Sequence, residues 1–460
     1  MRLAIVATHP IQYHAPWFRH LSESHELTVY YAHRQDSRGQ AEAGFGVDFE
    51  WDVPLLDGYG YQWLTNVARA PSISTFAGCD TPEIAEYIRT QRFDACLVLG
   101  WNKKSYWQAF RACKRTHTPI LCRGDSQLQT PRSRWQRMAK YLPYRVFLPS
   151  FDIHLCVGQR NREYLRHYGV RDSQLVLCPH FVDNEWFRSR ADEARQTGAA
   201  ARVRAEYGIP EDAFVLLYVG KFIAKKRVSD IVEAAIRLVR GNDVPKLHLL
   251  LVGDGRLRSE LERQAQDWRS NVHFAGFRNQ QEIPAYYAAG SAITLASESE
   301  TWGLVVNEAM ACGLPAIVSD AVGCAPDLIE EAKTGVSFPV GNVDALSDRI
   351  AQLSQLILRS ADDTLGRLRR ASGEPEMSAP EEARRGLALN EQTMRDSVRS
   401  KIASYSMQQA TAGLNEALRR IHRGANLRSA HETDDDDQEV SSEPDRSVVR
   451  DETLIDADNH

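Results

Sequence analysis

The sequence predicts an α/β protein made of two doubly wound, Rossmann-like domains. Its 460 residues suit two domains with sizeable cores, and a composition of 43% hydrophobic and 25% charged residues is that of an ordinary globular protein. Short apolar runs alternate with stretches of helical spacing, which is the pattern of a parallel sheet covered by helices. This alternation begins again near residue 203, after a polar, alanine-rich stretch.

The first domain is expected over residues 1–188, and residues 189–202 are expected to be a linker. Each predicted strand of this domain is a short apolar run bounded by polar residues. These strands are expected at 3–7, 27–31, 95–99, 119–122, 153–157 and 175–178.

The second domain is expected over residues 203–395. Its predicted strands lie at 214–219, 247–252, 291–295 and 315–319. Helical spacing follows from residue 345, and residues 360–382 are expected to form an insertion or a loose helix because Pro and Gly interrupt a polar stretch.

The C-terminal end divides into a predicted helix, residues 396–424, and an acidic tail, residues 425–460. The helix is expected to cross back to the first domain. The tail has few large apolar residues, so burial cannot offset its ordering entropy and it is predicted to be disordered. Residues 431–460 have a net charge of −10, which leaves +5 for the rest of the chain. That mild excess suits anionic nucleotides or an anionic membrane surface and is no evidence for nucleic-acid binding.

Composition excludes an integral membrane protein, because no apolar run approaches the ~18 residues of a span. The first apolar run, 3–7, is too short for a signal peptide. The eight cysteines form no CxxC pair and several lie in apolar strands, so we expect reduced core residues in a cytoplasmic protein.

The chain is organised around residues 297–313. A buried parallel strand is expected just before this stretch, a helix is expected after Gly303, and Gly313 ends that helix. A strand that feeds a helix through a small-residue turn offers free N–H groups and a positive dipole end to a phosphate. Glu300 and Glu308 would then lie at most about 12 Å apart. This separation suits a diphosphate-linked ligand, with one carboxylate at each end of the ligand.

The string formed by Glu300, Trp302, Gly303, Leu304 and residues 308–313 closely resembles the paired-glutamate signature of retaining GT-B glycosyltransferases of family 4, the glycosyl transferases group 1. The resemblance implies two facing domains with a cleft between them, with Glu300 toward the donor sugar and Glu308 on the ribose hydroxyls. It also implies a UDP- or GDP-sugar donor and neither a metal nor another cofactor. The alternative is an amphipathic helix whose glutamates are merely solvated.

Two further turns extend the resemblance on the donor side. Lys221 and Lys226 follow Gly220 at the spacing of the family's basic turn, where two cations would neutralise a departing diphosphate. The alternative, a solvated basic helix start, is disfavoured by the helix dipole. Gly253 is expected to allow strand, helix and ligand to approach closely, and Phe277 lies in a segment that resembles the base-reading loop.

The acceptor side departs from the family pattern. His9, Gln12 and Tyr13 belong to a His-Pro-Ile-Gln-Tyr variant of the first loop, which is expected either to line the cleft or to pack for structural reasons. Arg123 and Asp125 stand where relatives carry a histidine. Asp125 is expected either to orient an acceptor hydroxyl or to cap the next helix.

These features predict a retaining hexosyltransferase-type glycosyltransferase, with Glu300, Lys226 and Asp125 as its catalytic residues. The acceptor would be a glycan or a lipid-linked molecule, and the commonest family context is polysaccharide or cell-surface glycan assembly. Two alternatives are a sugar-nucleotide epimerase on the same scaffold and a non-catalytic nucleotide-sugar binding module.

A basic amphipathic helix is predicted from Thr130 as its cap, with Pro143 as its stop. Its apolar side chains recur at helical spacing on one face, and cations occupy the other faces. Such a helix suits an anionic lipid surface at the inner face of the membrane, or packs its apolar face on the sheet as most do. The apolar positions are Trp135, Met138, Ala139 and Leu142, and the cations are Arg132, Arg134, Arg137 and Lys140.

Overall fold

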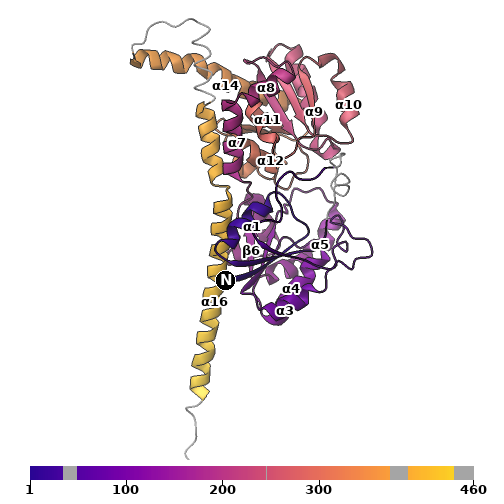
Figure 1. Cartoon of the computed structure of the whole chain (residues 1–460), viewed down its shortest axis with the longest axis vertical. Coiled ribbons are helices and arrows are strands. Elements are labelled where there is room, and N and C mark those ends of the chain that lie inside the picture. The colour runs from indigo at the N-terminus through magenta and orange to yellow at the C-terminus, as the bar shows by residue number, and fades with distance from the viewer. Residues whose placement is uncertain (35–48, 245, 373–391, 440–460) are drawn as a thin grey trace, which may run out of the picture. The chain divides into compact units, whose positions relative to one another are not determined.

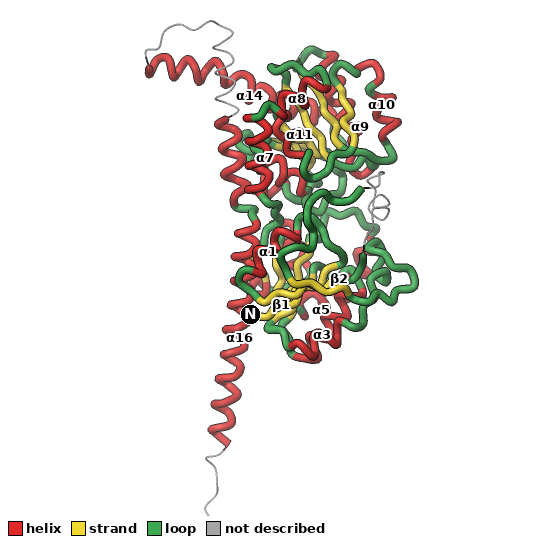
Figure 2. The backbone as a smooth tube through the Cα atoms, in the orientation of Figure 1, coloured by secondary structure: helices red, strands yellow, loops and turns green. Residues whose placement is uncertain are grey.

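A computed structural model describes residues 1–34, 49–244, 246–372 and 392–439 of the chain (Figure 1). Residues Met1–Ala417 form one compact unit that holds two parallel sheets, each flanked by helices (Figure 2). The expected α/β class with two Rossmann-like domains is therefore confirmed. Residues from Leu418 onward form a separate unit.

The first sheet has seven parallel strands in the order β3-β2-β1-β4-β5-β6-β7. The six strands that the sequence predicts are all present. The strand missing from the prediction is β3, an edge strand whose side chains are exposed or half-buried and therefore lack an apolar run. The strands are β1 Arg2–Ala7, β2 Glu26–Tyr31, β3 Gly60–Trp63, β4 Ala95–Val98, β5 Ile120–Gly124, β6 Ile153–Cys156 and β7 Leu175–Leu177.

The second sheet has six parallel strands in the order β10-β9-β8-β11-β12-β13. β10 and β13 are both absent from the prediction. The five residues of β10 include a histidine and a glycine, and the four residues of β13 include a glycine and a serine, so both carry little apolar signal. The strands are β8 Phe214–Val219, β9 Leu247–Val252, β10 Val272–Gly276, β11 Ala292–Leu295, β12 Ala316–Ser319 and β13 Gly335–Phe338.

Helices flank both sheets, and apolar side chains of strands and helices together form the two cores. Those of the first domain are α1 His14–Ser22, α3 Ile84–Gln91, α4 Lys104–Thr116, α5 Arg134–Phe147 and α6 Gln159–His167. The helices that follow are α7 Asn184–Gln196, α8 Ala199–Glu206, α9 Val228–Arg240, α10 Arg258–Gln264, α11 Ile283–Ala289, α12 Leu304–Ala311, α13 Ala325–Leu328, α14 Val343–Ser372 and α16 Met407–Glu439.

The stretch expected as a linker, residues 189–202, lies within α7 and α8 except for a turn at residues 197–198. Its alanines favour a helix, and Asp183 caps α7 by accepting a hydrogen bond from the backbone N–H of Trp186 at 3.0 Å. α7 packs against α11 and α12, so the segment is a structural part of the second domain.

Residues 360–382, expected as an insertion or a loose helix, continue α14 as far as Ser372, and 373–391 lie outside the described residues. α16 runs on to Glu439, past the residue where the sequence predicts disorder to begin. Residues 425–439 contain neither Gly nor Pro, which permits the helix. Residues 440–460 lie outside the described residues.

Residues 406–415 contact the first domain. The indole N–H of Trp17 donates to Thr411 Oγ1 at 3.1 Å, and the His25 ring bonds Asn415 at 2.9 Å. A Cβ at Gly413 would lie 2.1 Å from the carbonyl oxygen of Leu177, so the helix and β7 approach closely there.

In both sheets, successive strands are first added on one side of the first strand and later strands on its other side. This change of side places β1 next to β4 in the first sheet and β8 next to β11 in the second. Open α/β sheets bind ligands at the carboxyl ends of the strands at this point. All eight cysteines are buried and free, as expected for reduced core residues. Within the described residues, no helix has the length and apolar character needed to cross a membrane.

Candidate active site

The stretch 297–313 joins buried β11 to α12 through a tight turn. Gly303 precedes the first residue of α12 with φ of +103°, a left-handed conformation that favours glycine. A Cβ there would lie 3.1 Å from the side chain of Leu295 at the end of β11. The turn thus sets Glu300 before α12 and Glu308 within it, as the sequence predicts.

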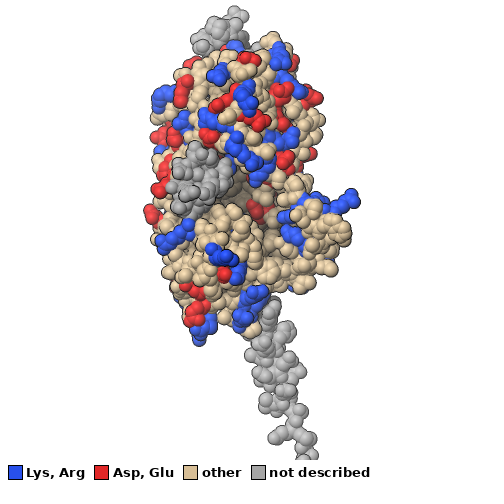
Figure 3. Space-filling model, turned by 90° about the vertical axis from the view of Figure 1, so that its right-hand side faces the viewer, with Lys and Arg blue, Asp and Glu red and all other residues tan. Residues whose placement is uncertain are grey.

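A cavity of about 380 Å³ lies at the carboxyl edge of the second sheet. The face drawn in Figure 3 is hollowed, with Lys and Arg side chains gathered above the hollow. The cavity brings together residues from both domains that lie far apart in sequence. Its lining includes Gln12, Tyr13, Gly220, Lys221, Lys226, Gly253, Phe277, Glu300 and Glu308.

Glu300 forms an ion pair with Lys226, which lies in the turn after β8. Both side chains are less than a fifth exposed, so water screens the pair only partly. The backbone carbonyl of Glu300 accepts a hydrogen bond of 2.7 Å from the side chain of Gln127, which belongs to the first domain. The carboxylate and the ammonium group are therefore held together at the cavity wall.

Lys221 lies beside this pair in the same cavity. Burial, together with the positive charges of Lys226 and Lys225, lowers its pKa to about 8, and Glu300 acts in the opposite direction. Three cations with one nearby carboxylate have an excess of positive charge that a bound anion would stabilise. The expected cationic turn is thus in place.

Glu308 is buried, with 4% of its surface exposed. The hydroxyl of Tyr13 donates to Oε1 at 2.8 Å, and the hydroxyl of Tyr287 donates to Oε2 at 2.5 Å. Burial raises the pKa of the carboxyl to about 7, although the two tyrosine bonds act in the opposite direction. Tyr13 thus links the first loop of the chain to the glutamate of α12.

Gly220 and Gly253 bring the ends of β8 and β9 into contact. Their φ angles are +151° and +141°, and a Cβ at residue 253 would lie 1.9 Å from the carbonyl oxygen of Gly220. A side chain at residue 253 would push the two backbones apart.

Trp302 lies behind the cavity and is not among its lining residues. Its ring is 3% exposed, and its indole N–H donates to Asn307 Oδ1 at 2.8 Å. The ring also lies 5.3 Å from the ring of His180, and a Cβ at Gly158 would lie 2.3 Å from it. These contacts hold the ring against the turn that precedes α12.

A second cavity, of about 340 Å³, lies on the side of the first domain. Tyr13 lines both cavities, and Arg123, Asp125, His14, His180 and Leu304 contribute to the second. Asp125 accepts a hydrogen bond of 2.7 Å from Thr301, the neighbour of Glu300. Ser133, with a capping box to Gln136, caps α5. Asp125 therefore does not cap that helix, and the capping alternative is wrong.

Arg123 is buried between two aromatic rings. Its guanidinium carbon lies 5.6 Å from the ring of Trp17 and 5.4 Å from that of Phe181. One N–H donates to the carbonyl of Pro179 at 3.0 Å. These contacts fix the guanidinium at the wall of the second cavity.

His9 lines neither of these two cavities. Its Nδ1 bonds the Thr8 hydroxyl at 2.9 Å, and burial, with the nearby His33 and Lys103, lowers its pKa to about 4. The ring is therefore neutral at pH 7 and packs within the loop, whereas Gln12 and Tyr13 of the same loop reach the cavity.

Two functional contacts have no strong signal in the sequence. Tyr287 lies in α11, where its helical spacing indicates a core residue, and only the fold brings its hydroxyl to Glu308. Gln127 follows β5 in a polar loop, and its bond to the backbone of Glu300 joins residues from different domains.

Residues 200–360 match the family described as glycosyl transferases group 1. The chain is 30% identical over 202 residues to the alpha-D-kanosaminyltransferase of Streptomyces kanamyceticus, an alignment of 43% of this chain and 50% of that protein. It is 33% identical over 152 residues to the N-acetyl-alpha-D-glucosaminyl L-malate synthase of Bacillus anthracis, with 33% and 39% covered. The chain thus spans half or less of the length of these two curated relatives.

Solved structures resemble nearly the whole chain in fold. A sucrose-phosphate synthase from Thermosynechococcus elongatus aligns with a TM-score of 0.64 at 18% identity, over 92% of this chain and 100% of that one. Anabaena HepE in complex with UDP and glucose aligns with a TM-score of 0.60 at 16% identity, over 91% and 99%. The two sheets of this chain have the GT-B fold, and its residues 200–360 match the family model of the glycosyl transferases group 1.

Proposed function

We propose that this chain is a retaining hexosyltransferase-type glycosyltransferase that uses a nucleotide-sugar donor, a UDP- or GDP-sugar. The observation that carries the proposal is the meeting of Glu300, Lys226 and Glu308 in one cavity at the carboxyl edge of the second sheet. This edge belongs to the segment that matches the glycosyl transferases group 1.

The donor would bind with its nucleoside toward Glu308 and Phe277 and its diphosphate toward the basic turn. A carboxylate freed from Tyr13 can accept hydrogen bonds from ribose hydroxyls. Lys221 and Lys226 would neutralise the diphosphate as it leaves, when its negative charge increases. Burial near Glu300 strengthens that effect because the local dielectric is low.

The sugar would lie between Glu300 and the second cavity, from which the acceptor hydroxyl attacks. Asp125 lines that cavity and is the proposed base or orienting group for this hydroxyl. The bond from anomeric carbon to phosphate oxygen breaks, the new bond to the acceptor oxygen forms, and the hydroxyl proton leaves with Asp125 or the diphosphate. Retention of configuration and independence from metal are parts of the proposal that rest on the family resemblance.

The acceptor would be a glycan or a lipid-linked molecule in polysaccharide or cell-surface glycan assembly. A lipid-linked acceptor goes with action in the cytoplasm at the inner face of a membrane, through a peripheral contact. The mild positive excess outside the acidic tail is compatible with such a surface.

The test is incubation of the protein with a panel of UDP- and GDP-sugars, with and without EDTA, while release of free sugar and nucleotide is measured. Slow hydrolysis of one donor that persists in EDTA supports the proposal. Conversion of a donor to an isomeric nucleotide sugar would indicate an epimerase. Tight binding of a donor without any turnover would indicate a non-catalytic binding module.

A further inference from the structure

The helix α5 exposes apolar side chains that the two cavities of the proposed active site do not use. Four large ones are mostly exposed to solvent: Trp135 is 78% exposed, Met138 65%, Leu142 72% and Val146 77%. Their spacing of three, four and four residues places them on one face of the helix. We propose that this face docks on an anionic lipid bilayer.

The exposure follows from how α5 is attached. None of its residues is buried, and its first turn is held by its own capping box between Ser133 and Gln136. The helix therefore begins at Arg134 with Ser133, not Thr130, as its cap, and Pro143 lies inside it instead of ending it. Only its C-terminal end packs well: Phe147 stacks on Trp107 with ring centres 4.1 Å apart, and Tyr144 lies 5.3 Å from Tyr168. The expectation that the apolar face packs on the sheet is therefore wrong for this helix.

The positive charge of α5 indicates which kind of surface would bind its exposed apolar face. Residues 134–147 include four Lys or Arg and no Asp or Glu. Within the described residues, none of these four cations lies within ion-pair distance of a carboxylate; Lys140 and Arg145 rest instead over tyrosine rings, at 4.5 and 5.6 Å. Docking of a second copy through the same face would bring two such sets of cations together, which is unfavourable. An anionic bilayer offers both the apolar phase and the counter-charge.

A groove beside the helix supplies a place for a headgroup. It has a volume of about 500 Å³ and is lined by Arg132 and Arg137 together with Met138, Tyr141 and Tyr168. Two guanidinium groups suit a phosphate, and tyrosine and tryptophan side chains favour the boundary between hydrocarbon and water. The groove and the exposed apolar face are adjacent, since Met138 belongs to both.

The loop before α5 joins this surface to the proposed active site. Asp125 bonds Thr301 and Gln127 bonds the backbone of Glu300, and the same loop continues to Leu128 and Thr130 in the groove. A docked chain would thus hold its second cavity close to the membrane. The delivery of a lipid-linked acceptor rests on the proposed function, whereas docking itself does not.

The test is co-flotation with vesicles of phosphatidylglycerol and phosphatidylcholine, or of phosphatidylcholine alone, at low and high salt. Wild type is expected to float with the anionic vesicles at low salt and to be released by salt. The triple variant Arg134→Glu, Arg137→Glu, Lys140→Glu is expected to lose at least about tenfold in partition. The matched control makes the same charge change at three exposed arginines of the second domain, Arg202→Glu, Arg263→Glu and Arg269→Glu, and should still bind.

A second measurement reports insertion directly. Because all eight native cysteines are buried, Leu142→Cys can be labelled selectively with an environment-sensitive dye. Its emission should shift to the blue on anionic vesicles, while the label at Val67→Cys, a residue 57% exposed and outside α5, should not shift. Failure of wild type to bind anionic vesicles at low salt, or equal binding by the charge-reversed variant, would overturn the proposal. So would a concentration-dependent dimer that Leu142→Ser abolishes. Glu300→Gln should bind vesicles normally, so failure of transfer and failure of docking are distinguishable.

Discussion

The chemistry of the site depends on two glutamates in different surroundings. Glu300 forms an ion pair with Lys226, whereas Glu308 is buried with two tyrosine hydroxyls, and burial raises its pKa to about 7. At neutral pH Glu308 therefore titrates, and its second hydrogen-bond partner, Tyr13, comes from the first domain. Donor binding in our account exchanges this phenol for ribose hydroxyls.

Glu308 makes stability depend on pH. Its pKa rises from 4.5 in the unfolded chain to about 7 in the folded one, so its contribution to stability is present below pH 4.5 and is lost as pH rises toward 7. Relative to Glu308→Gln, the unfolding free energy of wild type should fall by about 2–3 kcal/mol between pH 5 and pH 8. Denaturant titrations of both proteins at the two pH values measure this. A difference that stays constant with pH would show that the carboxyl is not held in a dry site.

Glu300→Gln should spare nucleotide binding and lower turnover. The amide keeps the size of the side chain but removes the charge that faces the proposed sugar site, so we expect a loss in kcat of about a hundredfold or more. Glu298→Gln is the control, since that carboxylate is two residues away, about half exposed and paired only loosely with Arg227 at 3.7 Å. Equal loss of activity in both variants would remove Glu300 from its proposed role.

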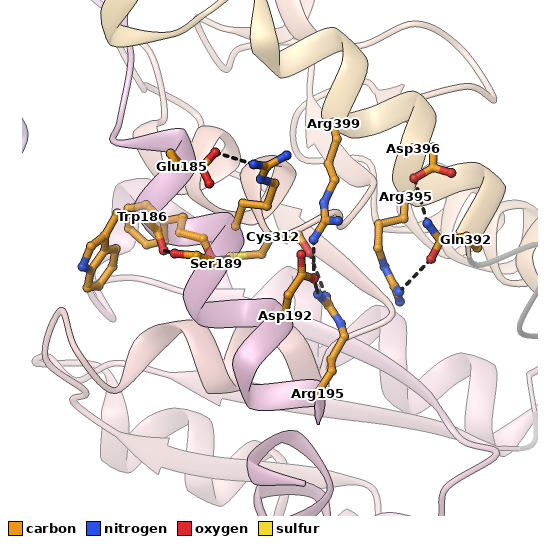
Figure 4. Close-up of polar contacts among 12 residues, drawn as sticks. Glu185, Trp186, Ser189, Asp192, Arg195, Cys312, Gln392, Arg395, Asp396 and Arg399 are labelled. Atoms are coloured by element: carbon orange, nitrogen blue, oxygen red, sulfur yellow. Dashed lines mark hydrogen bonds and ion pairs between the residues drawn. The ribbon is translucent and has the colours of Figure 1, made fainter. Parts of the chain in front are cut away.

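At the scale of elements, α12 is positioned from both ends. Gly303 starts it, and at its C-terminal end Arg195 of α7 donates to the carbonyl of Cys312 at 2.7 Å. Arg195 and Arg399 both donate to the carboxylate of Asp192, at 2.9 and 2.6 Å. Figure 4 shows the two arginines on either side of this carboxylate. A cation at the last carbonyls of a helix also complements its dipole. The helix that holds Glu308 is thus tied to α7 and to the C-terminal segment.

Asp192→Ala should destabilise the protein by about 1–2 kcal/mol, because two largely buried guanidinium groups lose their shared partner and solvent screens only part of the loss. Thermal unfolding measures the effect. The control is Glu193→Ala on the same helix, whose partner Arg190 is about half exposed, and it should change stability by less than about 0.5 kcal/mol. Equal effects of the two substitutions would show that the Asp192 network does not hold α12.

Strands and helices were predictable from the sequence where a local pattern of apolar residues marks them. Buried strands such as β1 and β11 are continuous apolar runs, so their positions follow from the sequence, whereas the exposed edge strand β3 leaves no such run. The amphipathic pattern of α5 predicts a helix but does not say whether its apolar face meets protein or solvent. The bond between Tyr13 and Glu308 joins residues 295 positions apart, and only the fold reveals it.

At the scale of the whole molecule, the proposed site is shared by the two domains of the unit Met1–Ala417. Besides the contacts at Glu300, Arg160 donates to the carbonyl of Val322 at 3.0 Å, and the backbone N–H of Gln159 donates to Asp327 at 3.1 Å. These bonds lie beside the turn after β12. They explain why residues of the first domain, Gln12 and Tyr13, line a cavity of the second.

Removal of residues 431–460 should leave turnover and thermal stability nearly unchanged. The segment is acidic and lies within the separate unit that begins at Leu418, so the core of the first unit does not depend on it. Activity and melting temperature of the shortened and full chains are compared side by side. A melting temperature lowered by many degrees would show that the tail contributes to the folded core.

The central claim is that this chain binds a nucleoside diphosphate through Glu308, and calorimetric titration with UDP and GDP tests it most directly. Wild type should bind one of them, and Glu308→Ala should bind it about 2–3 kcal/mol more weakly, because hydrogen bonds from ribose hydroxyls to a charged group are lost. Glu211→Ala, an exposed glutamate outside the cavity lining, should bind like wild type. Equal affinity of wild type and Glu308→Ala, or no binding of either nucleotide by wild type, would contradict the account.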